Sequence, residues 1–503
     1  MATMSELLHF PPNGDILPAN TAVLAIAIIT GALLLLYRWA LPTPIPGIPY
    51  NKAAAKSIFG DIGPMVQHTK KTNRLYDWLV AQNVQLNSPI IQLFTRPFTR
   101  PWVVVTDFQE TRDVLMRRGK EFDRSKFFSD ISGGITPENH FLMKTEDEFR
   151  RHRKWVQGIM TPGFLHQVAA PHTYHVCMDL IRLWEQKARL AQSHPISAEG
   201  DMHRTALDAI WSIVFGADSG KSTISAQLDL YSSINPSGRS QKIQMLWHSC
   251  QRHPIDQQST LCSQSPRAQN FLVSLFAAHD TTGTALTWAL KFLTDNQDVQ
   301  RKLRAALQSA HATAFAEKRQ PTVQEITGSV IHYRDAVVEE SLRCSLTESA
   351  IIRTAMKDVT LLGYHIPKGT EVFFMGNGPS IFTPAFDIDD SRRNPTYFAT
   401  NDRIGSWDTN GMADFIPERW LVDDGKGNKV FDAAAGPLLT FGLGERGCYG
   451  RKLSYVEMKL ILTLIVWNFE LLPCPKELSG YGAIDKMTHG PEQCYVRLAK
   501  VAM

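Results

Sequence analysis

A glycine-rich stretch around a cysteine, residues 441–451, restricts the fold of this chain more than any other feature. It reads FGLGERGCYGR and is followed at once by apolar residues at helical spacing, Leu453, Val456, Leu460 and Leu464. Cys448 is therefore expected at the start of a helix, where unpaired N–H groups and a partial positive charge favour a thiolate over a thiol. Because a thiolate binds metal ions, the stretch predicts a metal-binding loop.

The glycines of this loop extend the prediction. Gly442, Gly444, Gly447 and Gly450 let the backbone turn tightly beside a flat group, with amides free to donate to the sulfur, and Arg446 adds a cation for an acidic group. A cysteine thiolate bound to haem iron pushes electron density toward dioxygen and favours O–O cleavage. The alternative is a structural cysteine buried in a turn, which is the common state of an isolated cysteine.

Phe441, Gly444, Arg446, Cys448 and Gly450 match, at the right spacing, the haem-binding loop of the cytochrome P-450 monooxygenases, which this chain resembles. The resemblance implies the fold of that family, mainly α with a small β region, preceded by one N-terminal transmembrane helix. It also implies haem b (iron protoporphyrin IX) as cofactor, with Cys448 as the axial ligand of the iron and the other four residues in the cofactor loop.

Size and charge exclude other classes of protein. A chain of 503 residues with 44% hydrophobic content can bury a large core. Its net charge of +4 is too small to indicate a nucleic-acid partner. The seven cysteines lie far apart and form no CxxC pair, so neither a zinc site nor a disulfide framework is indicated.

The N-terminal part predicts a membrane anchor. Residues 16–37 are uncharged and long enough to span a bilayer, and the basic residues that follow, from Arg38 onward, place the C-terminal side in the cytosol. The alternative is a cleaved signal peptide, although the basic start of such a peptide is missing. We therefore divide the chain into residues 1–40 with the anchor, a proline-rich hinge at 41–50, and a haem-thiolate catalytic domain at 51–503. Resemblance to endoplasmic-reticulum members of the family implies a single-pass protein of that membrane, with its catalytic domain in the cytosol.

A second motif, AAHDTTG at residues 277–283, lies within a long helical pattern at residues 267–293. Asp, Thr and Gly are poor choices for a helix interior, and Thr281 can bond the carbonyl of Ala277, which loosens the helix and opens a groove. The resemblance identifies the oxygen-activating segment here. Asp280 is its proton-relay acid, and Thr281 supplies the hydroxyl that orients water and dioxygen.

Two arginines are implied partners of the haem propionates. Arg153 follows Phe149 by four residues, where the family usually has tryptophan; Phe149 can pack but has no N–H to donate. Arg353 stands by position where the second propionate partner is expected. The basic face of residues 149–155 can equally be an ordinary solvated surface or a docking face for an acidic electron donor.

A third motif places Glu340 and Arg343 at i and i+3 on one helical face, a pattern that many surface helices share without consequence. By resemblance, Arg419 completes a buried cluster with these two residues. We expect this cluster to be structural rather than catalytic.

Candidate pocket residues come from three segments, each with core packing as the alternative. They are Phe127, Phe128, Ile131 and Ile135 in a distal loop, Ser349, Ala350 and Ile352 after the Glu340 helix, and the tip of a C-terminal hairpin at 487–489. Residues 219–266 are rich in serine and glutamine and lack periodicity. The interval from Arg153 to the Asp280 motif is shorter than is usual in membrane-bound members. Either the helices that roof the substrate channel are abbreviated or the coding sequence has lost an exon.

The resemblance implies a monooxygenase that oxidises a lipophilic small molecule with dioxygen. Electrons would come from a separate NADPH–cytochrome P-450 reductase, which carries the flavins, with cytochrome b5 as a further partner. The loop region looks most like filamentous-fungal members, many of which act in secondary metabolism. Two alternatives stay open: a haem-thiolate isomerase or dehydratase that needs no reductase, and a membrane-anchored haem protein that has lost turnover.

Overall fold

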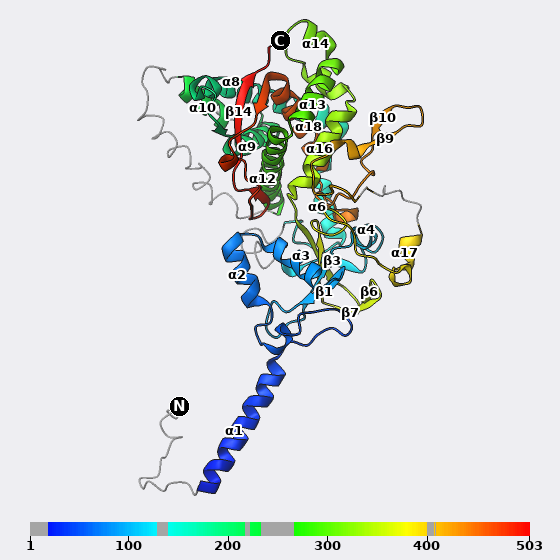
Figure 1. The fold of residues 1–503 in the computed structure, drawn as a ribbon. Coiled ribbons are helices and arrows are strands. Elements are labelled where there is room, and N and C mark those ends of the chain that lie inside the picture. The colour runs from blue at the N-terminus through cyan, green and yellow to red at the C-terminus, as the bar shows by residue number, and fades with distance from the viewer. Residues whose placement is uncertain are drawn as a thin grey trace.

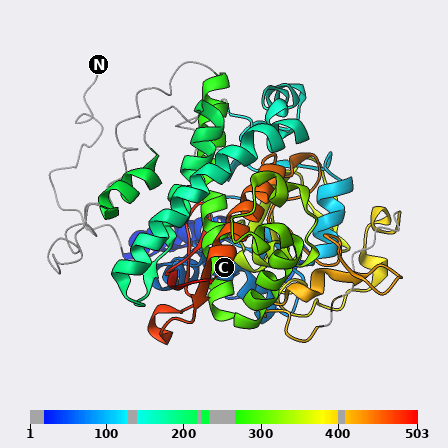
Figure 2. The same ribbon diagram turned by 90° about the horizontal axis from the view of Figure 1, so that it is seen from above.

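The computed structural model describes residues 19–127, 139–216, 222–232, 266–399, 407 and 409–502. A helical body is stacked on a smaller part that contains the main sheet, and one helix extends away from the sheet side (Figure 1). Seen from above, the helices cover the N-terminal elements (Figure 2). The mainly α fold with a small β region is confirmed.

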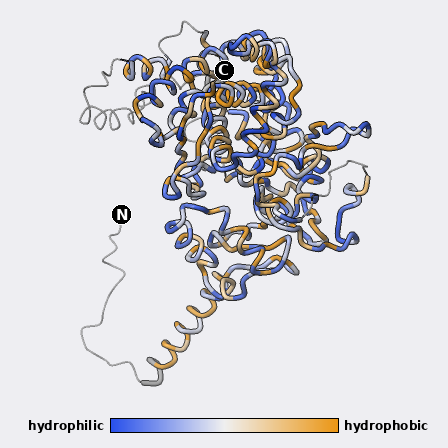
Figure 3. Tube along the Cα trace, turned by 45° about the horizontal axis from the view of Figure 1, so that its top comes forward, coloured by the Kyte–Doolittle hydropathy of each residue, from blue (hydrophilic) through white to orange (hydrophobic). Residues whose placement is uncertain are grey.

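The extended helix is α1 (Ala19–Ala40), which forms the apolar tube at one end of the molecule (Figure 3). Its window Val23–Ala40 has a mean hydropathy of 2.0 and no buried residue, so its length and composition suit a membrane span. The helix ends three residues beyond the predicted limit. There the Tyr37 hydroxyl donates to the Lys56 carbonyl at 2.7 Å, and the Trp39 and Phe98 rings lie 5.7 Å apart. Residues 41–50 form no regular element.

Four long helices build the core of the helical body. They are α8 (Ala170–Ala191), α9 (Glu199–Phe215), α12 (Pro266–Asp295) and α18 (Arg451–Asn468). Central helix α12 packs most extensively on α9 and also contacts α16 (His332–Ser345) and α18. Leu286, Leu290 and Leu464 are fully buried among these helices, so the core surrounds the segment that carries the Asp280 motif.

The remaining helices cover this core and the sheet. They are α2 (Ile62–Thr72), α3 (Leu75–Gln85), α4 (Phe108–Arg117), α6 (Asp147–Trp155), α7 (Pro162–Phe164), α10 (Thr223–Ser232), α13 (Gln297–Ala310), α14 (Ala312–Ala316), α15 (Val323–Gly328) and α17 (Pro395–Phe398). Helix α10 lies inside the stretch that sequence patterns left unread; most of the rest of that stretch is outside the described residues.

The largest sheet of the described residues has the strand order β1-β2-β8-β5-β3. Its strands are β1 (Ile90–Leu93), β2 (Trp102–Val105), β3 (Phe122–Arg124), β5 (Ala350–Ala355) and β8 (Glu371–Met375). Strand β2 is apolar, largely β-branched and buried throughout, as a central strand requires, and edge strand β1 is buried as well. Edge strand β3 pairs antiparallel with β5, which brings Arg124 directly opposite Arg353.

Smaller sheets complete the fold. The two-stranded sheets are β6 (Val359–Leu361) with β7 (Tyr364–Ile366), β9 (Leu421–Asp423) with β10 (Lys429–Phe431), and β12 (Ala483–Asp485) with β13 (His489–Pro491). A three-stranded sheet has the order β11 (Phe469–Leu472), β14 (Tyr495–Lys500) and β4 (Ile196–Ser197). The hairpin β12–β13 packs on α12, so its tip lies beside the Asp280 motif.

Candidate active site

The cysteine loop is held in shape by its glycines and one backbone bond. Gly444 has φ +69°, and a Cβ atom there would lie 2.0 Å from the Leu115 carbonyl oxygen, so only glycine fits. The Cys448 amide donates to the Phe441 carbonyl at 2.6 Å, which closes the loop immediately before α18. The cysteine therefore lies just before the start of a helix, as its sequence context predicts.

The Cys448 sulfur receives two backbone N–H groups, from Gly450 and Arg451, with Arg153 nearby. These donors lower the pKa of the thiol, but its burial among protein atoms has the larger effect, so the pKa is raised overall. The expectation that the helix end alone favours a thiolate is therefore wrong, because desolvation outweighs it. Cys448 as a whole residue is nevertheless exposed, and a metal ion bound to it would displace the thiol proton.

Helix α12 presents the second motif. The Thr281 hydroxyl donates to the Ala277 carbonyl at 2.6 Å, the helix-loosening bond that the sequence predicts. Thr281 is exposed although residues 282–290 are all buried. A side chain that solvent can reach within a core helix indicates open space beside the motif.

The Asp280 carboxylate is held from the C-terminal hairpin. The Thr488 hydroxyl donates to Asp280 Oδ2 at 3.0 Å, and Thr284 Oγ1 lies 3.1 Å from the same hydroxyl. His203 Nδ1 of α9 lies 3.8 Å from Asp280 Oδ1. The hairpin tip thus reaches the motif through Thr488, whereas Met487 is exposed. Sequence reasoning missed His203, since nothing in the spacing relates α9 to α12.

A group of arginines lies between the sheet and the cysteine loop. Arg353 is 5% exposed, and burial together with Arg124 and Arg446 lowers its pKa to about 9. Burial and Arg446 likewise lower the pKa of Arg124 to about 10. Two acids lie nearby, Asp123 and Glu348, and burial raises the pKa of Glu348 to about 7.

Like charges directly opposite each other across an antiparallel pair destabilise a sheet, and Arg124 and Arg353 occupy such positions. Among the described residues, no ion pair within 4.0 Å joins Arg353 to a carboxylate; its Nη1 donates to the Ile352 carbonyl at 2.9 Å. The two arginines therefore fit an anionic group between β5 and the cysteine loop, such as the carboxylates of a haem. Sequence reasoning missed Arg124 because strand register is needed to find it.

The other predicted cofactor arginines bond to protein groups. Arg446 donates to Thr145 Oγ1 at 2.7 Å, to the Met143 carbonyl and to Asp123 at 3.3 Å. Arg153 donates to the carbonyls of Glu445 and Gly447. The buried Phe149 ring lies 3.9 Å from the Arg446 guanidinium, so Phe149 acts here as a cation–π partner.

The predicted structural cluster is buried but has a different third member. Arg343 donates twice to Glu340, at 2.8 and 2.7 Å, and both side chains are fully buried. The indole of Trp420 donates to Glu340 Oε2 at 2.8 Å. Arg419 instead donates to the Gly411 carbonyl and lies over Trp407. The structure thus gives Trp420 the position expected for Arg419, because the turn at 417–420 directs the indole inward.

The candidate pocket residues divide by location. Phe127 packs edge-on against Trp102 and Phe373, and Ala350 and Ile352 belong to the same buried cluster, so these three side chains serve the core. The Ser349 hydroxyl donates to the Leu346 carbonyl. Phe128, Ile131 and Ile135 lie outside the described residues.

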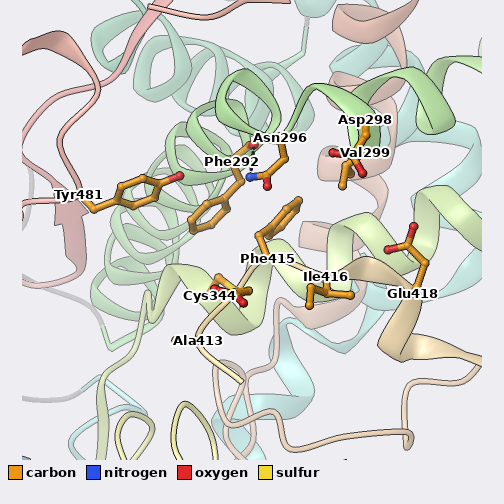
Figure 4. Close-up of a pocket in the computed structure, with 11 residues that line it drawn as sticks. Phe292, Asn296, Asp298, Val299, Cys344, Ala413, Phe415, Ile416, Glu418 and Tyr481 are labelled. Atoms are coloured by element: carbon orange, nitrogen blue, oxygen red, sulfur yellow. Dashed lines mark hydrogen bonds between the residues drawn. The ribbon is translucent and has the colours of Figure 1, made fainter. Parts of the chain in front are cut away.

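A separate hollow of about 590 Å³ opens at the far end of α12 (Figure 4). Phe292, Phe415 and Tyr481 form its aromatic wall, and Asp298 and Glu418 lie at its edge. None of Cys448, Thr281 or Arg353 lines it, so it is distinct from the candidate active site.

Comparison with known proteins agrees with this geometry. The sequence profile named Cytochrome P-450 matches residues 231–378 and 413–479. The cytochrome P-450 monooxygenase TRI13 of Fusarium sporotrichioides is 37% identical, over 95% of this chain and 99% of its own. The chain belongs to the cytochrome P-450 family. A Pestalotiopsis microspora monooxygenase, GME11363, is 33% identical over 98% and 99% of the two chains, and xilC of Penicillium crustosum is 31% identical over 93% and 94%.

These matches confirm the predicted family, the fold class and the assignment as a P-450 monooxygenase that uses haem. The apolar helix α1 suits a membrane anchor. The alignment with TRI13 runs over 583 positions although this chain has only 503 residues, so the relative contains segments that this chain lacks. This agrees with the unusually short interval before the Asp280 motif.

Proposed function

We propose that Cys448 is the axial ligand of haem iron and that Asp280 and Thr281 deliver protons for dioxygen cleavage. The observation that carries the proposal is the position of Cys448, an exposed residue toward whose sulfur two N–H groups at the start of α18 point. Arg353 and Arg124 would hold the propionates, because they lie opposite each other across β5 and β3 and both carry a positive charge. When bound, the haem supplies the oxygen chemistry.

The residues of the chain then act as follows. Gly450 and Arg451 donate N–H groups to the sulfur and so stabilise its anionic form. The Thr281 hydroxyl donates its hydrogen bond to the Ala277 carbonyl, so in this state the hydroxyl can only accept a hydrogen bond from water. The hydroxyl must break its bond to Ala277 before it can donate to another group. Asp280, held by Thr488, is the adjacent group that can carry a proton to this position.

The finer assignment follows from the anchor and the family. The protein would be a single-pass protein of the endoplasmic reticulum, with residues 51–503 in the cytosol because basic residues follow α1. There it would take electrons from an NADPH–cytochrome P-450 reductase and oxidise a lipophilic small molecule. The fungal monooxygenases among its relatives support a role in secondary metabolism.

The first test is the carbon-monoxide difference spectrum of dithionite-reduced microsomes that contain the protein. A red-shifted Soret band that disappears in Cys448→Ala supports the ligand assignment, and a band that survives the substitution rejects it. Substrate oxidation that requires both NADPH and reductase then separates the monooxygenase from an isomerase or dehydratase.

One observation favours a second candidate, a haem protein that has lost turnover: segments present in TRI13 are missing here. A normal thiolate spectrum, together with a failure to oxidise any of a panel of lipophilic compounds with reductase present, would support this candidate. A reductase-dependent product would exclude it.

A further inference from the structure

We propose that His203 is the proton entry to Asp280, so that protons pass from solvent through the imidazole to the carboxylate and then toward Thr281. The inference rests on the proposed function, because it deepens the role given there to Asp280. It assigns a positioning and proton-carrying role to α9, a helix that carries none of the sequence motifs.

The first observation is the contact between α9 and α12 at this point. A Cβ atom on Gly283 would lie 2.9 Å from His203 Cα and 2.7 Å from its Nδ1, so the glycine is what lets the two helices approach. This contact sets the His203 ring beside the residue three positions earlier, Asp280, on the same face of α12. The two long helices lie side by side in the helical body (Figure 1).

The second observation is the geometry of the pair. His203 Nδ1 lies 3.8 Å from Asp280 Oδ1. This is longer than a hydrogen bond, so proton transfer needs a small swing of the imidazole or one bridging water. The other carboxylate oxygen, Oδ2, accepts from Thr488. Each oxygen of Asp280 therefore has its own neighbour, and the one that faces His203 can be protonated without breaking the Thr488 bond.

The third observation is the direction of the hydroxyl chain. An ionised carboxylate only accepts, so Thr488 must donate to Asp280, and Thr284 must then donate to Thr488. This chain points its protons at Asp280 and ends at a buried threonine, 2% exposed, so it cannot bring in new protons. The side chains of His203 and Asp280 are 25% and 32% exposed, so water reaches both, but the imidazole is the group that ordinarily ionises near neutral pH and can hold a proton taken from solvent.

The proposed path moves only protons, and no group along it changes its oxidation state. A solvent proton converts neutral His203 to the imidazolium, which passes a proton to the Asp280 carboxylate and returns to neutral. The carboxylic acid gives that proton to the hydroxyl or water at Thr281. Asp280 is the acidic group that faces His203 from α12. The hairpin carries Lys486, whose positive charge interacts with Glu199, a residue one turn before His203 in α9.

The pairing itself is tested by the imidazole pKa of His203, measured by histidine C2 hydrogen–deuterium exchange and mass spectrometry in the holoenzyme. A carboxylate this close raises a histidine pKa by about 1–3 units, less when partly exposed. Asp280→Asn should therefore lower the His203 pKa by about one pH unit and leave exposed His175 of α8 unchanged. An unchanged His203 pKa would overturn the proposal. This arm keeps His203 in place, so it does not depend on how its variants fold.

The proton path is tested by the NADPH oxidation of the reductase-reconstituted enzyme without added substrate. His203→Gln should slow oxidation about tenfold and raise the solvent deuterium effect. This loss is smaller than the roughly hundredfold of direct general acid–base catalysis, because water also reaches Asp280. Adding Asp280→Asn to His203→Gln should cause no loss beyond that of Asp280→Asn alone.

The matched control is His175→Gln, the same change on an exposed position of α8. If His203→Gln behaves like this control while Asp280→Asn is slow, His203 is not the entry. If Asp280→Asn itself oxidises NADPH at the normal rate, the proposed role of Asp280 fails instead, and the pKa arm still decides whether His203 and Asp280 interact.

Discussion

Replacing Arg124 by glutamine is expected to change two measurable quantities in opposite directions. In the protein without haem, Arg124 and Arg353 face each other across β3 and β5, and burial is the main cause that lowers the pKa of both side chains. Like charges at such positions cost up to about 1 kcal/mol. The Arg124→Gln apoprotein should therefore be more stable by about 1 kcal/mol, which corresponds to a rise of at most about 2 °C in Tm.

The haem-bound protein should respond with the opposite sign. If Arg124 holds a propionate, its loss removes a charge-assisted hydrogen bond worth about 1.5–3 kcal/mol, roughly a 10- to 150-fold fall in haem affinity. Scanning fluorimetry of the apoprotein gives the first quantity, and haem transfer to excess apomyoglobin gives the second. Arg150→Gln on the exposed face of α6 is the control, since Arg150 pairs with Asp147 and Glu445 at the surface. A less stable apoprotein with unchanged haem release would refute the reasoning.

Three further substitutions test other parts of the site. Gly444→Ala should destabilise the protein by about 3 kcal/mol or more and abolish the thiolate spectrum, because φ is +69° and the Leu115 carbonyl leaves no space for a Cβ atom. The control is Gly158→Ala, where a Cβ atom would meet no neighbour, and it should change neither the unfolding free energy nor the spectrum. Trp420→Phe should lower the free energy of unfolding by about 1–3 kcal/mol, because a buried Glu340 oxygen loses one hydrogen-bond donor. Arg419→Gln should lower it by less than about 1 kcal/mol. Chemical denaturation measures both, and a larger loss for Arg419→Gln than for Trp420→Phe would restore Arg419 to the cluster. Burial raises the pKa of Glu457 from 4.5 to about 8, so the free energy of unfolding should fall as pH rises from about 4.5 to 8. Glu457→Gln should remove up to about 5 kcal/mol of this loss, and parallel pH profiles for the two proteins would contradict the assignment.

Local chemistry explains which parts of the site the sequence predicts. The loop at 441–451 is visible because glycines, the cysteine and the following helix are all neighbours in sequence, and the bond that closes it joins Cys448 to Phe441. The Thr281–Ala277 bond is likewise local to one helical turn. Neither feature needs a contact with a distant segment, so spacing alone is enough to find it.

Contacts between distant segments explain the rest. Arg124 faces Arg353 only once β3 is in register with β5, and His203 meets Asp280 only because Gly283 lets α9 approach. The choice of Trp420 over Arg419 depends on which way one short turn points its side chains. The net rise of the Cys448 pKa depends on how much protein surrounds the sulfur, which no spacing reveals.

These contacts also connect folding with the cofactor. The arginines that face each other across β3 and β5 are an unfavourable arrangement for a protein that has to fold without haem, and burial opposes ionisation of the Cys448 thiol. An anionic group at the arginines and a metal at the sulfur would relieve both, and a ligand that binds only the folded state at about 1,000 times its Kd adds about 4 kcal/mol of stability. On the proposed assignment, the site exchanges apoprotein stability for haem affinity, so that one substitution at Arg124 should raise the first and lower the second.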